Sequence, residues 1–279
     1  MLGKLMKYDL RAGIRWFGLV WAVLLALGVI NGFTLRYILA ADVQHWLVRF
    51  FLGVMPLLML FLVFIAAVVV MIIYVIRRFY KGLLCDEGYL MFTLPATAEE
   101  HIASKTLTAL ILEIATILVC CLSGLLLTVI YAHDYVGDFL QLMREVPEYW
   151  KTYDMPSGFG WLTAEGILFV ILAYITWNLR IYTSLSLGHL ANKHRLLWSL
   201  LAYFGIGIAV SMLSGSLSAV LFGSSSALFG DLLYGAESVT ALFRFAQVWF
   251  AALIALFVIE IAVYFFSTRA ILKNRLNLE

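Results

Sequence analysis

The segment Phe50–Ile76 runs for 27 residues without a charged side chain. A run of this length and apolarity is sufficient for an α-helix that crosses a membrane. The chain as a whole is 64% hydrophobic and only 13% charged, which is far from the composition of a soluble domain. Its apolar segments are continuous and about 20 residues long, unlike the alternating strands of a membrane barrel. The sequence therefore predicts an all-α polytopic membrane protein with six transmembrane helices.

The whole chain, 1–279, is expected to form a single transmembrane domain. The expected spans are 16–35, 50–76, 106–131, 161–179, 196–217 and 245–266. A polar loop at 77–105 and an extracellular loop at 132–160 separate the second, third and fourth spans. Residues 218–244 are too apolar for a free loop and too short to span twice, so an outer re-entrant or surface hairpin is expected there. A tail, 267–279, ends the chain.

The basic residues predict which side of the membrane each loop occupies. Residues 1–15 interleave basic and apolar side chains, as in a helix lying on a membrane surface or as a positive flank of the first span. The two termini, the 77–105 loop and the loop after the fourth span together carry 14 basic residues, against 5 in the other loops. By the positive-inside rule, both termini and the 77–105 loop are expected to be cytoplasmic.

Small residues recur at every fourth position of the fifth expected span. A helix would bring them onto one stripe where another backbone can approach closely. The stripe consists of Gly207, Ser211, Gly215, Ala219 and Gly223. Its partner is either a neighbouring helix of the same chain or the same helix of a second copy, and both interpretations stay open.

Two carboxylates fall inside expected spans, Glu113 in the third and Glu260 in the sixth. A carboxylate facing lipid costs several kcal/mol, so each is expected to face the bundle interior or a water-filled cavity. They are either hydrogen-bonded structural groups or part of a cavity that contacts a cation. Asn178 and Arg180, near the inner end of the fourth span, are possible partners of either carboxyl.

The sequence contains none of the common motifs for nucleotide binding, metal-dependent hydrolysis or serine hydrolysis. The sequence has no G-x-x-x-x-G-K-[ST] loop for ATP phosphates, no H-E-x-x-H and no G-x-S-x-G. We therefore expect no catalytic residue, no metal site and no cofactor in the chain, and no nucleic-acid partner.

The polar loop 77–105 has an ordered pattern. Leu90, Phe92 and Leu94 alternate with other residues up to Pro95. After Ala96, the residues Thr97-Ala98-Glu99-Glu100 form a capping box, which predicts the start of a helix. Large apolar residues in a cytosolic loop indicate that the loop docks onto a partner.

This loop resembles the cytosolic loop of ABC-2 type transporter permeases. The family's pattern is an acidic residue and glycine, a hydrophobic run into leucine-proline, and a lysine that opens the third helix. Here it reads Asp86-Glu87-Gly88-Tyr89-Leu90-Met91-Phe92-Thr93-Leu94-Pro95, followed by Glu99 and Ser104-Lys105. The first nine residues and the last nine, 271–279, are also similar to the ends of a group of these permeases in Gram-positive bacteria.

The resemblance implies the membrane subunit of an ABC exporter in a bacterial plasma membrane. It implies an N-terminal elbow helix, a coupling helix in the 77–105 loop and an outer hairpin between the fifth and sixth spans. ATP and Mg²⁺ would bind a separate ATP-binding subunit, and a second permease chain, identical or different, would complete the transporter. The substrate would be amphipathic, such as an antimicrobial peptide, a drug or a lipid-like molecule. The residues implied to contact the ATPase subunit are Asp86, Glu87, Gly88, Tyr89, Leu90, Phe92, Leu94 and Pro95.

Two other classes of function stay open. A proton- or ion-coupled secondary transporter would depend on Glu113 and Glu260. A non-transporting membrane regulator would bind a partner and tolerate polar-to-apolar changes within the spans.

Overall fold

The computed structural model describes residues 2–40, 45–85, 88, 95–133, 137, 140–141, 143–145, 159–191, 193–224 and 238–274. Nearly all of these residues are helical, and none of them belongs to a β-strand. Six helices in this part of the chain are long and apolar enough to cross a membrane. The expected all-helical architecture with six segments of membrane-spanning length is therefore confirmed.

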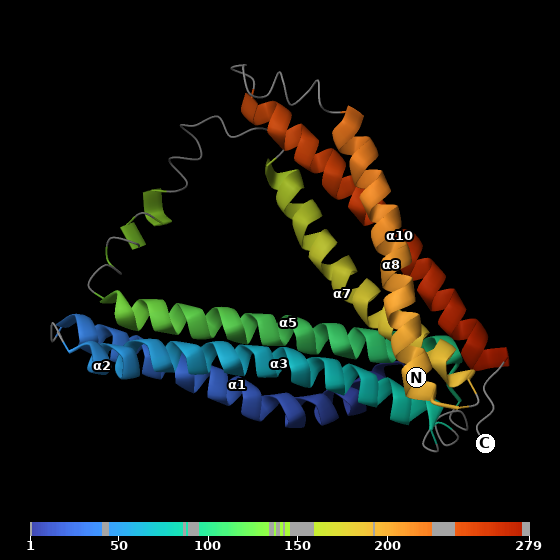
Figure 1. The fold of residues 1–279 in the computed structure, drawn as a ribbon, viewed down its shortest axis with the longest axis horizontal. Coiled ribbons are helices and arrows are strands. Elements are labelled where there is room, and N and C mark those ends of the chain that lie inside the picture. The colour runs from blue at the N-terminus through green and yellow to red at the C-terminus, as the bar shows by residue number, and fades with distance from the viewer. Residues whose placement is uncertain are drawn as a thin grey trace. The chain divides into compact units, whose positions relative to one another are not determined.

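Figure 1 shows the order of the elements along the chain. They are α1 (Leu2–Ala40), α2 (Trp46–Arg49), the π-helix η1 (Phe50–Val54), α3 (Met55–Phe79), the π-helix η2 (Tyr80–Leu84), α5 (Ala98–Tyr131), α7 (Phe159–His189), α8 (Arg195–Ser224) and α10 (Ser238–Asn274).

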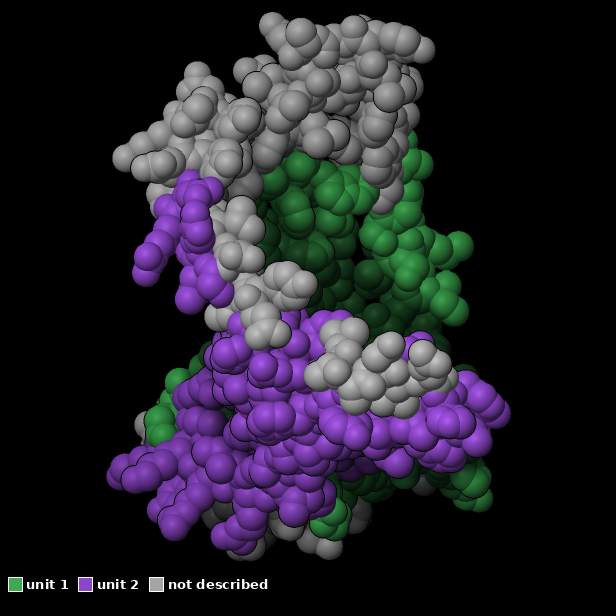
Figure 2. Space-filling model, turned by 90° about the vertical axis from the view of Figure 1, so that its left-hand side faces the viewer, with its two compact units in different colours: residues 1–3, 76–110, 154–279 green, residues 4–75, 111–153 purple. Residues whose placement is uncertain are grey.

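The chain divides into two compact units, which Figure 2 draws in different colours. Unit 1 comprises residues 1–3, 76–110 and 154–279, and unit 2 comprises residues 4–75 and 111–153. Helices α3 and α5 each contribute to both units. Each unit therefore combines segments from distant parts of the sequence.

In unit 2, parts of α1, α3 and α5 lie side by side (Figure 1). The hydroxyl of Tyr74 donates a hydrogen bond of 3.1 Å to the carbonyl of Asp9, and its ring meets Phe17 edge-on with 5.5 Å between centroids. One turn along α1 from Phe17, the indole of Trp21 donates to the hydroxyl of Thr116 on α5 over 3.1 Å. Aromatic side chains therefore join α1 to both of its neighbours.

Two glycines let α1 and α5 approach closely. A Cβ atom on Gly28 would lie 2.6 Å from the carbonyl oxygen of Ser123, and one on Gly32 would lie 2.7 Å from Cβ of Ile130. The Ser123 hydroxyl donates to the carbonyl of Leu24 over 2.7 Å. Glycines four residues apart are a common means of packing helices in lipid, because they leave room for the partner's backbone.

The second apolar segment begins with a π-helical turn, Phe50–Val54, which Pro56 explains. Proline has no N–H to donate, and its ring would clash with the carbonyl of residue 52, so the wider turn avoids this conflict. The side-chain amide of Asn31 donates to the carbonyl of Pro56 over 3.1 Å. The apolar helical stretch runs from Trp46 to Leu84 and contains the expected span 50–76.

In unit 1, α7 packs against both α8 and α10. The hydroxyls of Thr183 and Thr268 lie 3.0 Å apart, and both side chains are buried. Farther along the same pair of helices, the ring of Phe169 contacts Phe250 and Phe257 with centroid distances of 5.4 and 5.2 Å. Polar and aromatic contacts therefore alternate along the interface between α7 and α10.

The turn from α7 to α8 depends on Gly188. A Cβ atom at this position would lie 2.6 Å from the Cα atom of Ser199, so the backbone of α8 rests directly on the last turn of α7. The residue before α8, His194, has a φ of 54°.

Many large apolar side chains are exposed in both units, while several small polar ones are buried. Leu19 is 74% exposed and Phe204 is 58% exposed, whereas Asn31, Ser186 and Thr268 are fully buried. This arrangement suits a lipid environment, in which helices associate through small and hydrogen-bonding residues and the outer surface is apolar.

The N-terminal segment 1–15 is not a helix separate from the expected first span 16–35. Helix α1 is continuous from Leu2 to Ala40. The Asp9 carbonyl accepts a hydrogen bond from Tyr74 on α3, which holds the early turns against that helix. That these turns lie along the membrane surface as an elbow stays a prediction.

The other long helices extend beyond the expected spans. Helix α5 begins at Ala98 instead of 106, α7 ends at His189 instead of 179, α8 ends at Ser224 instead of 217, and α10 covers Ser238–Asn274 instead of 245–266. A helix satisfies its own backbone hydrogen bonds, so it need not stop where the apolar residues stop. Residues 218–224 thus continue α8 and 238–244 open α10, while the middle of the expected hairpin lies outside the described residues.

Candidate functional site

Only two of the eight residues expected to contact a partner are described, Gly88 and Pro95. The other six, Asp86, Glu87, Tyr89, Leu90, Phe92 and Leu94, lie outside the described residues. The N–H of Gly88 donates to the carbonyl of Cys85 over 2.7 Å, and a Cβ atom on Gly88 would lie 2.6 Å from the carbonyl oxygen of Leu83. The glycine of the motif is therefore required by close backbone contact.

The chain enters the loop from a firmly anchored segment of unit 1. The ring of Phe79 is fully buried and stacks on Tyr182 of α7, with centroids 4.2 Å apart and an interplanar angle of 9°. The next residue, Tyr80, meets His189 of α7 edge-on at 6.3 Å. The end of α3 and the start of η2 are thus attached to the C-terminal half of α7.

The chain leaves the loop through the capping box, which the structure confirms. The Thr97 hydroxyl accepts a hydrogen bond from the N–H of Glu100 over 3.2 Å, and the Glu100 carboxylate accepts one from the N–H of Thr97 over 3.0 Å. Beside it, Glu99 forms an ion pair with Arg269 of α10, with 2.6 Å between Oε1 and Nη2. The first turn of α5 is therefore tied to the last turns of α10.

The two ends of the loop also meet each other. Lys105 is only 4% exposed, and its Nζ atom would lie 3.2 Å from a Cβ atom on Gly82 of η2. The lysine and the preceding Ser104, which belong to the sequence motif, are thus both buried within unit 1. A glycine at position 82 leaves the space that the ammonium group occupies.

A cluster of polar residues lies deeper in unit 1, centred on Arg180 of α7. Its guanidinium donates to the carbonyl of Tyr203 on α8 over 3.1 Å, and Cζ lies 4.2 Å from the centre of the Tyr203 ring. A Cβ atom on Gly207 would collide with Nη2 of Arg180. Gly207 therefore provides the space in which the guanidinium reaches α8.

Helix α10 contributes a carboxyl and a phenol to the same cluster. The Tyr264 hydroxyl donates to Oε2 of Glu260 over 3.3 Å, one helical turn away. Near Arg180 on α7, the hydroxyl of Thr183 lies 3.2 Å from the carbonyl of Tyr264, which it can donate to. Contacts of Arg180 with α8 and of Thr183 with α10 thus bring α7, α8 and α10 together around this cluster.

The position of Arg180 corrects the sequence prediction. It was expected to open a loop after a span ending at 179, yet α7 continues through it to His189. The residues that follow, 181–187, contain neither glycine nor proline, so nothing stops the helix there. That Arg180 is a partner of Glu260 stays a prediction. The contacts of Arg180 with Tyr203 and of Glu260 with Tyr264 were not expected. The i, i+4 spacing of Glu260 and Tyr264 was the available signal.

The remaining intramembrane candidates have separate surroundings. Glu113 is 3% exposed. It belongs to unit 2, whereas Glu260 belongs to unit 1, so the two carboxyls are treated as separate sites. Asn178 is fully buried in unit 1, and its amide donates to the carbonyl of Tyr174 in its own helix over 3.0 Å.

The small-residue stripe of α8 does not act as one packing surface within unit 1. Gly207 contacts Arg180, as described above, while Ser211, Gly215 and Ala219 are exposed. The side-chain surroundings of Gly223 lie outside the described part of the chain. Most of the stripe is therefore not covered by the other described helices of unit 1, and its partner stays open.

The cluster is equipped to bind a polar group. Oε1 of Glu260 and Nε of Arg180 are buried, and neither has a hydrogen-bond partner in the described part of the chain. A cation and an acceptor in an otherwise apolar bundle can hold a polar group of a ligand or an ordered water. Within the described ranges, no group of three or more His, Cys, Asp or Glu side chains is placed to hold a metal ion.

In comparisons with known proteins, the chain matches no protein-family model, no curated protein and no solved structure.

Proposed function

We propose that the chain is the membrane-spanning permease subunit of an ABC-2 type exporter in a bacterial plasma membrane. It works with a separate ATP-binding subunit, which carries the ATP and Mg²⁺, and with a second permease chain. Both termini and the loop between α3 and α5 face the cytoplasm. The transported substrate is amphipathic, a peptide antibiotic, a drug or a lipid-like molecule.

The observation that supports this proposal best is the anchoring of the loop. One flank is attached to α7 through the stacked rings of Phe79 and Tyr182, and the other meets α10 through the weaker, exposed ion pair of Glu99 and Arg269. A coupling loop must transmit the movement of an ATPase to helices that line the substrate path. These attachments give such a movement a direct route to α7 and a weaker one to α10.

Helix α7 extends this route to the polar cluster. Arg180 lies two residues from Tyr182 on the same helix and contacts α8, while Thr183 contacts Thr268 of α10. A displacement of α7 by the loop would change the contacts of Arg180 and thereby the surroundings of Glu260. We assign the cluster to the substrate path on this basis.

Co-purification tests the proposal. The protein is extracted from native membranes in mild detergent, and its partners are identified by mass spectrometry. We expect the wild-type chain to retain an ATPase with a phosphate-binding loop. A double variant, Glu87→Arg with Leu90→Asp, is expected to lose it, because the change reverses a rim charge and places a charge in the apolar centre of the contact.

The matched control is the double variant Glu145→Arg with Leu140→Asp. It carries the same two types of substitution in the loop 132–160, which is expected on the opposite side of the membrane. Leu140 is 53% exposed, so the substitution is tolerated by the fold. This control should retain the ATPase. Absence of any ATPase from the wild-type preparation, under conditions that keep other complexes intact, would refute the proposal.

A secondary transporter coupled to protons or ions is the second candidate, and the carboxyl of Glu260 in the polar cluster favours it. It predicts transport into proteoliposomes that requires a proton or ion gradient, needs no ATPase and is abolished by Glu260→Gln. A membrane regulator would instead retain an ATPase without supporting ATP-dependent transport.

A further inference from the structure

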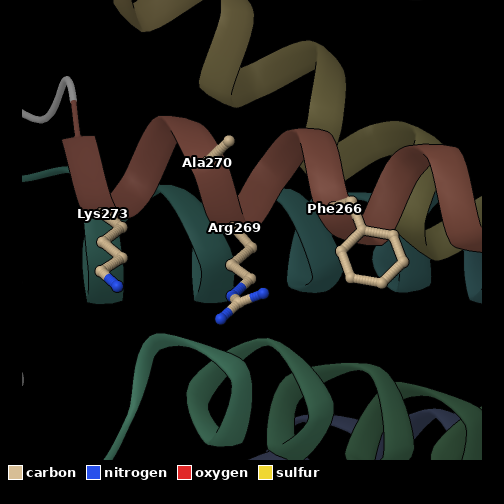
Figure 3. A pocket seen from close by; sticks show the side chains of 4 residues that line it. All are labelled: Phe266, Arg269, Ala270 and Lys273. Carbon is tan, nitrogen blue, oxygen red and sulfur yellow. The ribbon is translucent and has the colours of Figure 1, made fainter.

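A basic surface pocket lies near the C-terminal end of α10 in unit 1 (Figure 3). Its volume is about 400 Å³, and it is lined by Phe266, Arg269, Ala270 and Lys273. Residues spaced three, four and seven apart share one side of a helix. Figure 3 shows Phe266, Arg269 and Lys273 projecting from the same side of α10. The pocket thus combines two cations with an aromatic ring that is 59% exposed.

The apolar part of α10 sets the depth of this pocket in a bilayer. Residues 246–267 contain Glu260 as their single charged residue. These 22 residues span about 33 Å at 1.5 Å per residue, close to the roughly 30 Å of a hydrocarbon core. Phe266 therefore lies at the edge of the hydrocarbon, while Arg269 and Lys273 lie at the level of the lipid headgroups.

The charges of the pocket are only partly compensated. Arg269 forms its ion pair with Glu99, but the two side chains are 39% and 47% exposed. Exposed pairs of this kind are weak, so another anion can compete for the guanidinium. Lys273 is exposed and forms no ion pair with any residue in the described ranges. Among the described residues, Lys273 thus remains uncompensated beside a carboxylate that another anion can replace.

We propose that this pocket binds the phosphate of an anionic phospholipid. Arg269 and Lys273, one turn apart, hold the phosphate, and the acyl chains lie against Phe266 and Ala270. Glu99 competes with the phosphate for Arg269, so the carboxylate weakens lipid binding. The site depends on α10 and the first turn of α5 and does not require the proposed transport function.

Lipid titration of the full-length protein tests this site. The purified protein in detergent is titrated with phosphatidylglycerol or phosphatidylcholine, and bound lipids are counted by native mass spectrometry. We expect a preference for phosphatidylglycerol. Arg269→Gln and Lys273→Gln should each lower its affinity about fivefold, the effect of one basic residue near a lipid surface, while Lys273→Arg should retain it.

The variant Glu99→Gln should change lipid affinity in the opposite direction, and it is the decisive test. It should raise the affinity for phosphatidylglycerol several-fold, because Arg269 loses its competing carboxylate. A gain that is selective for phosphatidylglycerol over phosphatidylcholine separates this effect from a general loss of folding. Lys193→Gln and Glu145→Gln, which make the same charge changes elsewhere, should leave the affinity unchanged.

Three results would overturn the proposal. One is unchanged or weaker lipid binding by Glu99→Gln. Another is a loss in Lys193→Gln as large as that in Lys273→Gln, which would indicate general charge attraction. The third is displacement of the lipid by millimolar inorganic phosphate, which would make free phosphate the ligand.

Discussion

Substitution of Gly207 by alanine should disrupt the polar cluster of unit 1. The added methyl group would collide with Nη2 of Arg180, which is the flexible end of a long side chain. The guanidinium will therefore move and leave α8 in place. In moving, it loses its hydrogen bond to the Tyr203 carbonyl and its position over the Tyr203 ring.

The lost contacts set the expected magnitude. A hydrogen bond with a charged donor contributes about 1.5–3 kcal/mol, and a cation–π contact contributes about 0.5–2 kcal/mol. Alanine is about 1 kcal/mol more favourable than glycine within a helix, which offsets part of the loss. We expect Gly207→Ala to lower the free energy of unfolding by about 1–4 kcal/mol. For a chain of this size, the midpoint temperature of thermal unfolding falls by about 2–4 °C for each kcal/mol of lost stability.

Thermal unfolding in detergent measures this effect against a matched control. Gly205 lies on the same helix, and a Cβ atom there would have no neighbour within 4 Å. Gly205→Ala should therefore be neutral or slightly stabilising. In a background of Arg180→Met the penalty of Gly207→Ala should vanish, because the colliding guanidinium is absent. The reasoning is refuted if Gly207→Ala matches Gly205→Ala, or if its penalty persists without Arg180.

Two further substitutions test the packing of unit 1. Gly188→Ala should lower the free energy of unfolding by about 1–3 kcal/mol, because the new methyl group meets the backbone of Ser199. Gly166→Ala on the same helix is the control: its methyl group has open space, so the free energy of unfolding should not fall. Thr97→Ala should lower the free energy of unfolding by about 0.5–2 kcal/mol and speed amide hydrogen exchange in the first turn of α5. Thr97→Ser should keep the cap. Unchanged exchange in Thr97→Ala would contradict the role of the capping box.

The features predictable from sequence are those that local chemistry determines. Six apolar segments required six helices, since a backbone in lipid must satisfy its own hydrogen bonds. The capping box at Thr97 was readable because its donors and acceptors lie within four residues of one another. Gly88 was part of a recognised pattern, and its close contact with Leu83 explains why a side chain is excluded.

The features missed depend on contacts between distant residues. A charge at the end of an apolar run resembles the end of a span, so Arg180 was assigned to a loop. Its partners are a backbone carbonyl and a ring on the next helix, and neither leaves a pattern in the sequence. The helix ends were missed for a related reason, because hydropathy reports the hydrocarbon boundary and hydrogen bonding carries a helix beyond it.

Helix α7 contacts three other helices of unit 1 that contribute to the candidate site. Successive residues of an α-helix point about 100° apart, so Arg180, Tyr182 and Thr183 face three directions. Arg180 meets α8, Tyr182 stacks on the end of α3, and Thr183 meets α10. A rotation or shift of α7 must therefore alter all three interfaces together. In the proposed exporter, this is the property that α7 would need in order to link the loop between α3 and α5 with the polar cluster.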